Sequence, residues 1–241
     1  MIAIKSPKPI IRVKQADLDV QDLEGLLRIH WKIKNLTLYS GFYTRIDQVF
    51  LLWGIITSII FFTAQFAPIN WGTQTLVWSA LTLIGTLGTV QLAWYWVSVE
   101  QLRWVIYCWV ALMLGGLVLT NVAILGTVWP FLLMYLCPLW LGLSGVGYLC
   151  TAWGLRSRTF LLGGVLHLLA IAFLPYLPQA QYLTTGIITA GVLFLLAELQ
   201  WDMQSTSNYK LLTPEQQKFN QRQRQLRQQE LQPSSMVDEK V

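Results

Sequence analysis

Three long stretches without charge dominate the chain. Residues 48–99, 104–155 and 159–197 contain no Asp, Glu, Lys or Arg. One helical crossing of the hydrocarbon core needs roughly 20 apolar residues, so each stretch is long enough for two crossings. Proline and glycine in the middle of each stretch mark a turn, because they interrupt helices. The pattern predicts an all-α integral membrane protein with six spans, near Val49–Ala67, Thr75–Val99, Trp104–Leu125, Trp129–Gly154, Thr159–Leu174 and Tyr182–Leu199.

The positive charges predict how these spans are oriented. Eight of the 17 Lys and Arg precede the first span and six follow the last, while Arg103, Arg156 and Arg158 lie in the two connections on that same side. Cytoplasmic loops are enriched in Lys and Arg, so we expect both termini to be cytoplasmic. The membrane is expected to be a bacterial plasma membrane or a related internal membrane. The expected division is a cytoplasmic segment (1–46), a transmembrane domain (47–201) and a polar, Gln-rich cytoplasmic tail (202–241).

The segment Asp22–Tyr39 precedes the first span and is rich in Leu and Ile. Drawn as a helix, its apolar residues share one broad face, and Arg28, Lys32 and Asn35 lie opposite. A basic amphipathic helix of this kind lies in the plane of the membrane interface. We therefore predict an amphipathic interfacial helix before the first span. A soluble amphipathic helix packed on the loops is the alternative.

The composition excludes several classes of function. The chain is 54% hydrophobic and 12% charged, far from the balance of a soluble protein. No ionisable residue except His167 lies inside a span, which argues against a proton-coupled pump or a charged pore. No nucleotide-binding loop, HExxH motif or paired-cysteine metal site is present. The basic residues follow the predicted topology, so no nucleic-acid partner is expected.

The candidate site is a polar layer near the middle of the membrane. His167 is nine residues from Arg158 and Gln91 is nine from Glu100, which places both about 13 Å deep at 1.5 Å per helical residue. Polar groups in hydrocarbon need partners, so they are expected to face the interior of the bundle. The layer either sets helix packing or forms a substrate site, and its members are His167, Gln91, Ser58, Ser144 and Thr189.

His167 also has the chemistry of a cofactor ligand, since a neutral imidazole nitrogen can bind a haem or chlorophyll metal. No second axial candidate lies inside a span. We therefore expect no cofactor and no metal. Pairs of small residues four apart in the sequence indicate close helix packing instead, and they are Gly85 and Thr89, Gly116 and Thr120, Gly147 and Thr151, and Gly186 and Ala190.

The tetrapeptide Gly142-Leu143-Ser144-Gly145 in the fourth span resembles the GxSG motif of rhomboid intramembrane serine proteases. That family has a six-helix core, and the resemblance implies Ser144 as a nucleophile activated by a histidine on the sixth core helix. Here the sixth span has no histidine, and His167 is on the fifth. The six-span layout also looks like the membrane subunits of ABC-2 type exporters, which usually have a longer connection after the second span.

These patterns leave three hypotheses for function. The first is a non-enzymatic accessory or assembly protein that binds another integral membrane protein or complex within the lipid bilayer. It is favoured by short connections and by the lack of a complete catalytic set. The second is a transporter or permease subunit for a small neutral or apolar molecule, with His167 and Gln91 at its site. The third is an enzyme of rhomboid type.

Overall fold

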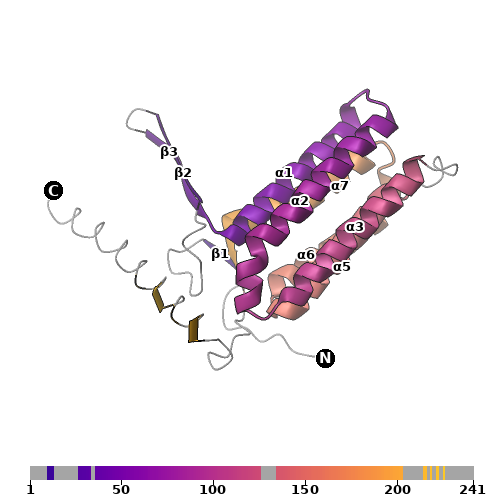
Figure 1. Ribbon diagram of the computed structural model, residues 1–241. Helices are drawn as coiled ribbons and strands as arrows, with labels where there is room; N and C mark the ends of the chain where they lie inside the picture. Colours follow the sequence, from indigo (N-terminus) through magenta and orange to yellow (C-terminus); the bar gives the residue numbers. More distant parts are fainter. Residues whose placement is uncertain are drawn as a thin grey trace.

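The computed structural model describes residues 10–13, 27–33, 36–125 and 134–202, and isolated positions between 214 and 225. Its main elements are long helices (Figure 1). Their bounds are α1 Arg45–Phe66, α2 Trp71–Val99, α3 Arg103–Leu125, α5 Leu136–Leu155, α6 Arg158–Phe173 and α7 Gln181–Glu198, with a short 3₁₀ helix, η2, at Leu174–Tyr176.

The six helices α1, α2, α3, α5, α6 and α7 are long and apolar enough to cross a membrane, which confirms the predicted number of spans in the described part of the chain. Their outward faces carry exposed aliphatic side chains; Leu76 and Leu87 on α2 are 66% and 70% exposed. Exposed apolar surface of this kind suits lipid, so the chain is a multi-pass protein of a lipid bilayer. In the described residues α5 begins at Leu136 after a turn at residues 134–135. The predicted start of the fourth span at Trp129 lies outside the described residues.

The helices form two groups of three. Figure 1 shows α1, α2 and α7 side by side in one group and α3, α5 and α6 in the other. In the first group α1 packs against both α7 and α2, and in the second α5 packs against both α6 and α3. The contact between α2 and α3, which follow each other in the chain, joins the groups along one side.

Polar side chains cap the first turns of α1 and α2. Thr44 and Asp47 form a reciprocal capping box at the start of α1, in which Thr44 accepts from the Asp47 N–H and Asp47 accepts from the Thr44 N–H at 2.8 Å. Asn70 accepts from the Thr73 N–H at 2.8 Å and caps α2. These caps satisfy backbone donors that would otherwise have no partner at the membrane boundary.

The predicted amphipathic helix before the first span is wrong over the described part of that segment, and residues 22–26 and 34–35 lie outside the described residues. Strands β2 (Leu27–Ile33) and β3 (Leu36–Tyr43) pair antiparallel, with Leu27 opposite Tyr43 and Ile33 opposite Leu36. The sequence from Leu27 to Ile33 alternates strictly between apolar and basic residues. That period of two is typical of a strand, and the helical interpretation overlooked it.

A second small sheet joins the two ends of the described chain. Strand β1 (Ile11–Val13) pairs antiparallel with β4 (Leu199–Trp201), which directly follows α7. The start of α1, the end of α7 and both small sheets therefore lie at one end of the bundle, called here the terminal end (Figure 1). The bundle itself is all-α, as predicted, and the four short strands lie outside it.

Candidate functional site

A cavity of about 160 Å³ lies between the helices. All six spanning helices contribute to its wall, and no Asp, Glu, Lys or Arg is among the residues that line it. On α1 the lining runs from Ile46 to Phe61, which corresponds to about 22 Å along a helix. The cavity is therefore narrow and follows the axis of the bundle, and its wall is mostly aliphatic and aromatic.

Aromatic side chains line the terminal end of this cavity. Phe50 of α1, Phe160 of α6 and Trp201 of β4 are all lining residues. The Phe160 and Trp201 rings meet edge to face at 5.0 Å between centroids, and Phe50 lies 6.0 Å from Phe160 and 6.5 Å from Trp201. Edge-to-face pairs pack well and stabilise one another, so these rings form a compact boundary.

His167 of the predicted polar layer is one of the residues that line the cavity. Its side chain is fully buried, and Nδ1 lies 2.8 Å from the carbonyl oxygen of Gly163, one turn earlier on α6. A carbonyl oxygen only accepts, so Nδ1 carries the hydrogen. The other ring nitrogen, Nε2, is buried and has no hydrogen-bond partner in the described structure. The Tyr148 ring packs on the imidazole at 4.9 Å between centroids.

The other members of the predicted polar layer fall in different places. Ser144 of α5 and Thr189 of α7 line the cavity together with His167. Ser58 donates to the carbonyl of Gly54 at 2.7 Å on its own helix and is not a lining residue. Gln91 is exposed on the outer surface of α2. The structure thus brings three of the five residues to one cavity and leaves Gln91 and Ser58 outside it.

The rhomboid-like arrangement of Ser144 with a histidine is not present. Ser144 and His167 line the same cavity, but Nε2 of His167 has no hydrogen-bond partner among the described residues, and Nδ1–H donates to the carbonyl of Gly163. A serine nucleophile needs a base within hydrogen-bonding reach. In this structure the Ser144 hydroxyl has no such contact with His167.

Four tryptophan–threonine hydrogen bonds join neighbouring helices around the cavity. Each indole Nε1–H donates to a threonine Oγ1 on the adjacent helix, and the helices exchange these bonds reciprocally within the pairs α1–α2 and α3–α5. The bonds are Trp53 to Thr89 at 2.7 Å, Trp78 to Thr63 at 3.2 Å, Trp109 to Thr151 at 2.9 Å and Trp140 to Thr120 at 3.1 Å.

Three of the predicted small-residue pairs, each a glycine and a threonine, are the places where these tryptophan rings pack on the neighbouring helix. A Cβ added to Gly147 would lie 2.5 Å from the ring of Trp109, which bonds to Thr151. A Cβ on Gly116 would lie 3.0 Å from the ring of Trp140, which bonds to Thr120, and one on Gly85 would lie 3.0 Å from the ring of Trp53, which bonds to Thr89. At these two glycines an aliphatic side chain lies closer still, Leu143 at 2.6 Å and Ile56 at 2.9 Å. The small residues therefore leave room for an indole ring of the neighbouring helix, whereas the sequence predicted that they bring two helix backbones close together.

A sequence signal for this arrangement exists and was missed. The pattern W-x-[A/G]-L-x₃-G-x₃-T begins at Trp78, Trp109 and Trp140, a spacing of 31 residues in both intervals. Self-similarity at a fixed period indicates repeated structural units. A search for internal repeats would have grouped each tryptophan with the glycine and threonine of its own repeat. It would not have shown that the indole bonds to a threonine of the neighbouring helix.

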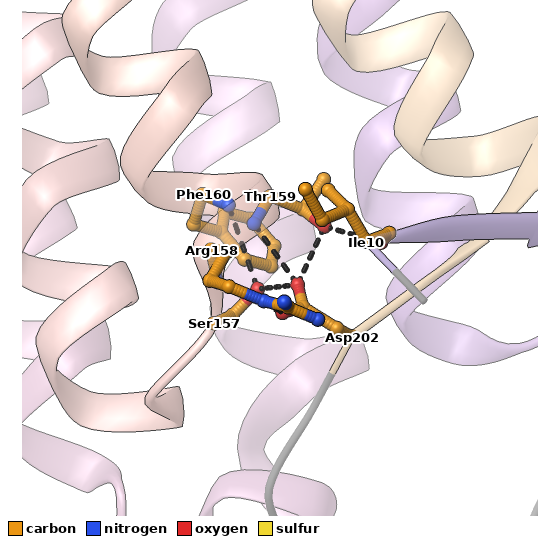
Figure 2. A network of polar contacts seen from close by, with 6 residues as sticks. All are labelled: Ile10, Ser157, Arg158, Thr159, Phe160 and Asp202. Atoms are coloured by element: carbon orange, nitrogen blue, oxygen red, sulfur yellow. Dashed lines mark hydrogen bonds and ion pairs between the residues drawn. The ribbon is translucent and has the colours of Figure 1, made fainter. Parts of the chain in front are cut away.

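A buried carboxylate, Asp202, ties the terminal end together (Figure 2). Its side chain is 1% exposed and lies beside the start of α6. It accepts from the Ser157 hydroxyl at 2.9 Å, from the Arg158 N–H and Nε–H at 3.1 and 2.8 Å, and from the Thr159 N–H at 2.9 Å. The Thr159 hydroxyl lies between this carboxylate (2.6 Å) and the carbonyl of Ile10 (2.7 Å). We call these five residues the Asp202 cluster.

The hydrogen bonds of the Asp202 cluster keep the carboxyl group of Asp202 ionised. Burial raises the pKa of Asp202, but the Arg158 and Thr159 side chains and backbone N–H groups outweigh it, so the pKa lies below its usual value of 3.8. Asp202 is therefore an anion at the N-terminus of α6, where the helix dipole favours negative charge. Trp201 is the preceding residue, so the cluster also fixes the aromatic boundary of the cavity.

The β2–β3 hairpin is attached to the bundle by two tyrosines. The Tyr43 hydroxyl donates to the Glu198 carboxylate at the end of α7 at 2.5 Å, and the Tyr39 hydroxyl lies 3.0 Å from the same carboxylate and bonds to Tyr43. Burial and the nearby Glu198 carboxylate raise the pKa of Tyr43 above its usual value. Tyr43 therefore stays protonated and can donate at neutral pH.

Comparison with protein families, with curated proteins and with solved structures finds no match for this chain. The case for a function therefore rests on the chemistry of its own residues.

Proposed function

We propose that this six-span membrane protein is a carrier for a small, uncharged and largely apolar molecule, which it binds in the cavity between its two groups of helices. The observation that supports this proposal is the cavity itself, uncharged and lined from all six spans. An apolar cavity of about 150 Å³ is large enough to bind benzene, and the one here has about 160 Å³. Its narrow shape along the bundle axis suits passage of one small molecule at a time.

The proposal includes an orientation and a location. Lys and Arg gather at the terminal end, so that end faces the cytoplasm, in a bacterial plasma membrane or a related internal membrane. Phe50, Phe160 and Trp201 then bound the cavity on its cytoplasmic side. A carrier of this kind needs no catalytic set, metal, cofactor or nucleic-acid partner.

The experiment that tests the proposal is mass spectrometry of the protein purified in mild detergent, with a variant that fills the cavity. Ser144→Leu adds bulk to the wall, whereas Val146→Leu, on the same helix, changes a side chain that is 44% exposed on the outside. We expect a small molecule to co-purify with the wild type and with Val146→Leu and to be lost from Ser144→Leu. Absence of any small molecule from the wild type would contradict the proposal.

A second candidate function is that of an accessory or assembly protein, and the β2–β3 hairpin favours it. The hairpin extends away from the bundle at the terminal end (Figure 1), and Leu27, His30 and Lys32 on it are exposed. Strands that present free edges and exposed side chains are suited to pairing with another chain. The same mass spectrometry separates the two functions, because a stoichiometric membrane protein in place of a small molecule would support the accessory function.

A further inference from the structure

Nε2 of His167 is a buried hydrogen-bond acceptor without a partner among the described residues, on a side chain that lines the cavity. Nδ1–H donates to Gly163, and no acidic side chain lines the cavity to stabilise a charged ring. The imidazole is therefore neutral, and Nε2 holds its lone pair. A buried acceptor without a partner is unfavourable, so a bound molecule that supplies a donor would remove that cost.

Several polar hydrogens of the wall are already used by the protein itself. Thr86, Thr89 and Thr189 donate their hydroxyls to carbonyls four residues earlier on the same helix. The indole N–H groups of Trp53 and Trp109 donate to threonines. A ligand that can only accept, such as a quinone or an aldehyde, would leave Nε2 without a partner, whereas a ligand that can donate would satisfy it.

We propose that the molecule bound in this cavity is an uncharged alcohol, phenol or N–H compound of about the size of phenol, held by a hydrogen bond from its O–H or N–H to Nε2 of His167. This inference rests on the proposed function and specifies the chemistry of its ligand. The Tyr148 ring, 4.9 Å from the imidazole, lies beside the apolar body of the ligand. A water molecule is a poorer occupant, because buried waters usually have two to four polar partners and most of this wall is apolar.

The test compares three probes of nearly equal size that differ in one polar group. The full-length protein in lipid nanodiscs is titrated with 4-fluorophenol (a donor), 4-fluorotoluene (neither donor nor acceptor) and 4-fluorobenzaldehyde (an acceptor only). Binding is followed by ¹⁹F NMR, with empty nanodiscs as the reference for partition into lipid. The variants are His167→Phe and, as the matched control, His30→Phe, which makes the same change at an exposed position of β2.

We expect the wild type to bind 4-fluorophenol at least as tightly as 4-fluorotoluene and more tightly than 4-fluorobenzaldehyde. His167→Phe should shift the ratio of the phenol and toluene dissociation constants about tenfold against the phenol, and His30→Phe should leave it unchanged. A general change in cavity size affects both dissociation constants alike, so it cancels in their ratio.

The outcomes separate this inference from the proposed function. If none of the three probes binds the wild type, the cavity does not take small molecules and the proposed function fails. If 4-fluorotoluene binds and the wild type prefers it over 4-fluorophenol, or if His167→Phe keeps the wild-type ratio, the role of His167 is refuted while cavity binding stands. If the His167→Phe variant does not fold, the relative affinities of the wild type for the three probes still test the role of His167.

Discussion

Gly147 is the position where the packing around the cavity can be tested with one methyl group. A Cβ at this position would lie 2.5, 2.7 and 2.7 Å from three ring atoms of Trp109. Carbon atoms pack best at about 3.5–4.0 Å, so the indole would have to retreat by about 1 Å. Gly147→Ala is therefore expected to destabilise the protein.

The surroundings of Trp109 determine the size of that effect. Its Nε1–H donates to Thr151 at 2.9 Å, and its ring meets Tyr148 edge to face at 5.6 Å between centroids. Tyr148 is buried and packs in turn on Phe160 and His167. Overpacking of this kind costs about 1–3 kcal/mol and a lost hydrogen bond in a membrane about 0.6 kcal/mol, so we expect a loss of about 2–4 kcal/mol.

The assay is reversible unfolding by SDS in mixed micelles, followed by the helical circular dichroism signal. Gly115→Ala is the matched control, because a Cβ there has no atom within 4 Å, and it should leave the free energy of unfolding unchanged or raise it by up to about 1 kcal/mol. Trp109→Phe makes room for the new methyl group, so Gly147→Ala should cost less in that background. If Gly147→Ala unfolds at the same SDS concentration as Gly115→Ala, the close packing of the Trp109 ring against Gly147 is refuted.

Three further predictions follow from the placement of polar residues. Gln91→Leu should not destabilise the protein, and its effect should add to that of His167→Ala within about 0.5 kcal/mol, because Gln91 is exposed on α2 and does not line the cavity. Asp202→Asn should lower the free energy of unfolding by about 2–3 kcal/mol at pH 7, since charge-assisted hydrogen bonds are lost. A cysteine at Asn70 should react with an impermeant thiol reagent added outside cells, and one at Gln101 should not.

Each of these predictions has a control and a contrary result. Strong coupling between Gln91 and His167 in unfolding experiments would show that they share a layer after all. The lowered pKa of Asp202 means that its stabilisation is present above the usual pKa of 3.8 and is lost as the pH falls through the lowered pKa. Asp202→Asn should weaken the loss of stability on acidification through that range, and Glu215→Gln, an exposed control, should not. Labelling at Gln101 from outside would reverse the proposed topology.

The number of spans was determined by the sequence because a membrane crossing depends on local composition. Any uncharged stretch of sufficient length is favourable in hydrocarbon whatever its neighbours are, so residues 48–99 already predicted two helices. The same reasoning applies to the 31-residue repeat, since the Trp, Gly and Thr of each unit lie on one helix. These features need no knowledge of which helices meet.

Which polar side chains meet depends on how the helices are rotated and paired, and only the tertiary structure decided that. Gln91 and His167 were predicted at the same depth, yet one is exposed and the other fully buried, because depth along a helix says nothing about the direction of a side chain. The tryptophan bonds and the Asp202 cluster likewise join residues far apart in the chain; Asp202 meets Ser157 only because α7 and β4 return to the start of α6. The hairpin at Leu27–Tyr43 is intermediate, since its alternation is local but its attachment through Tyr43 to Glu198 is tertiary.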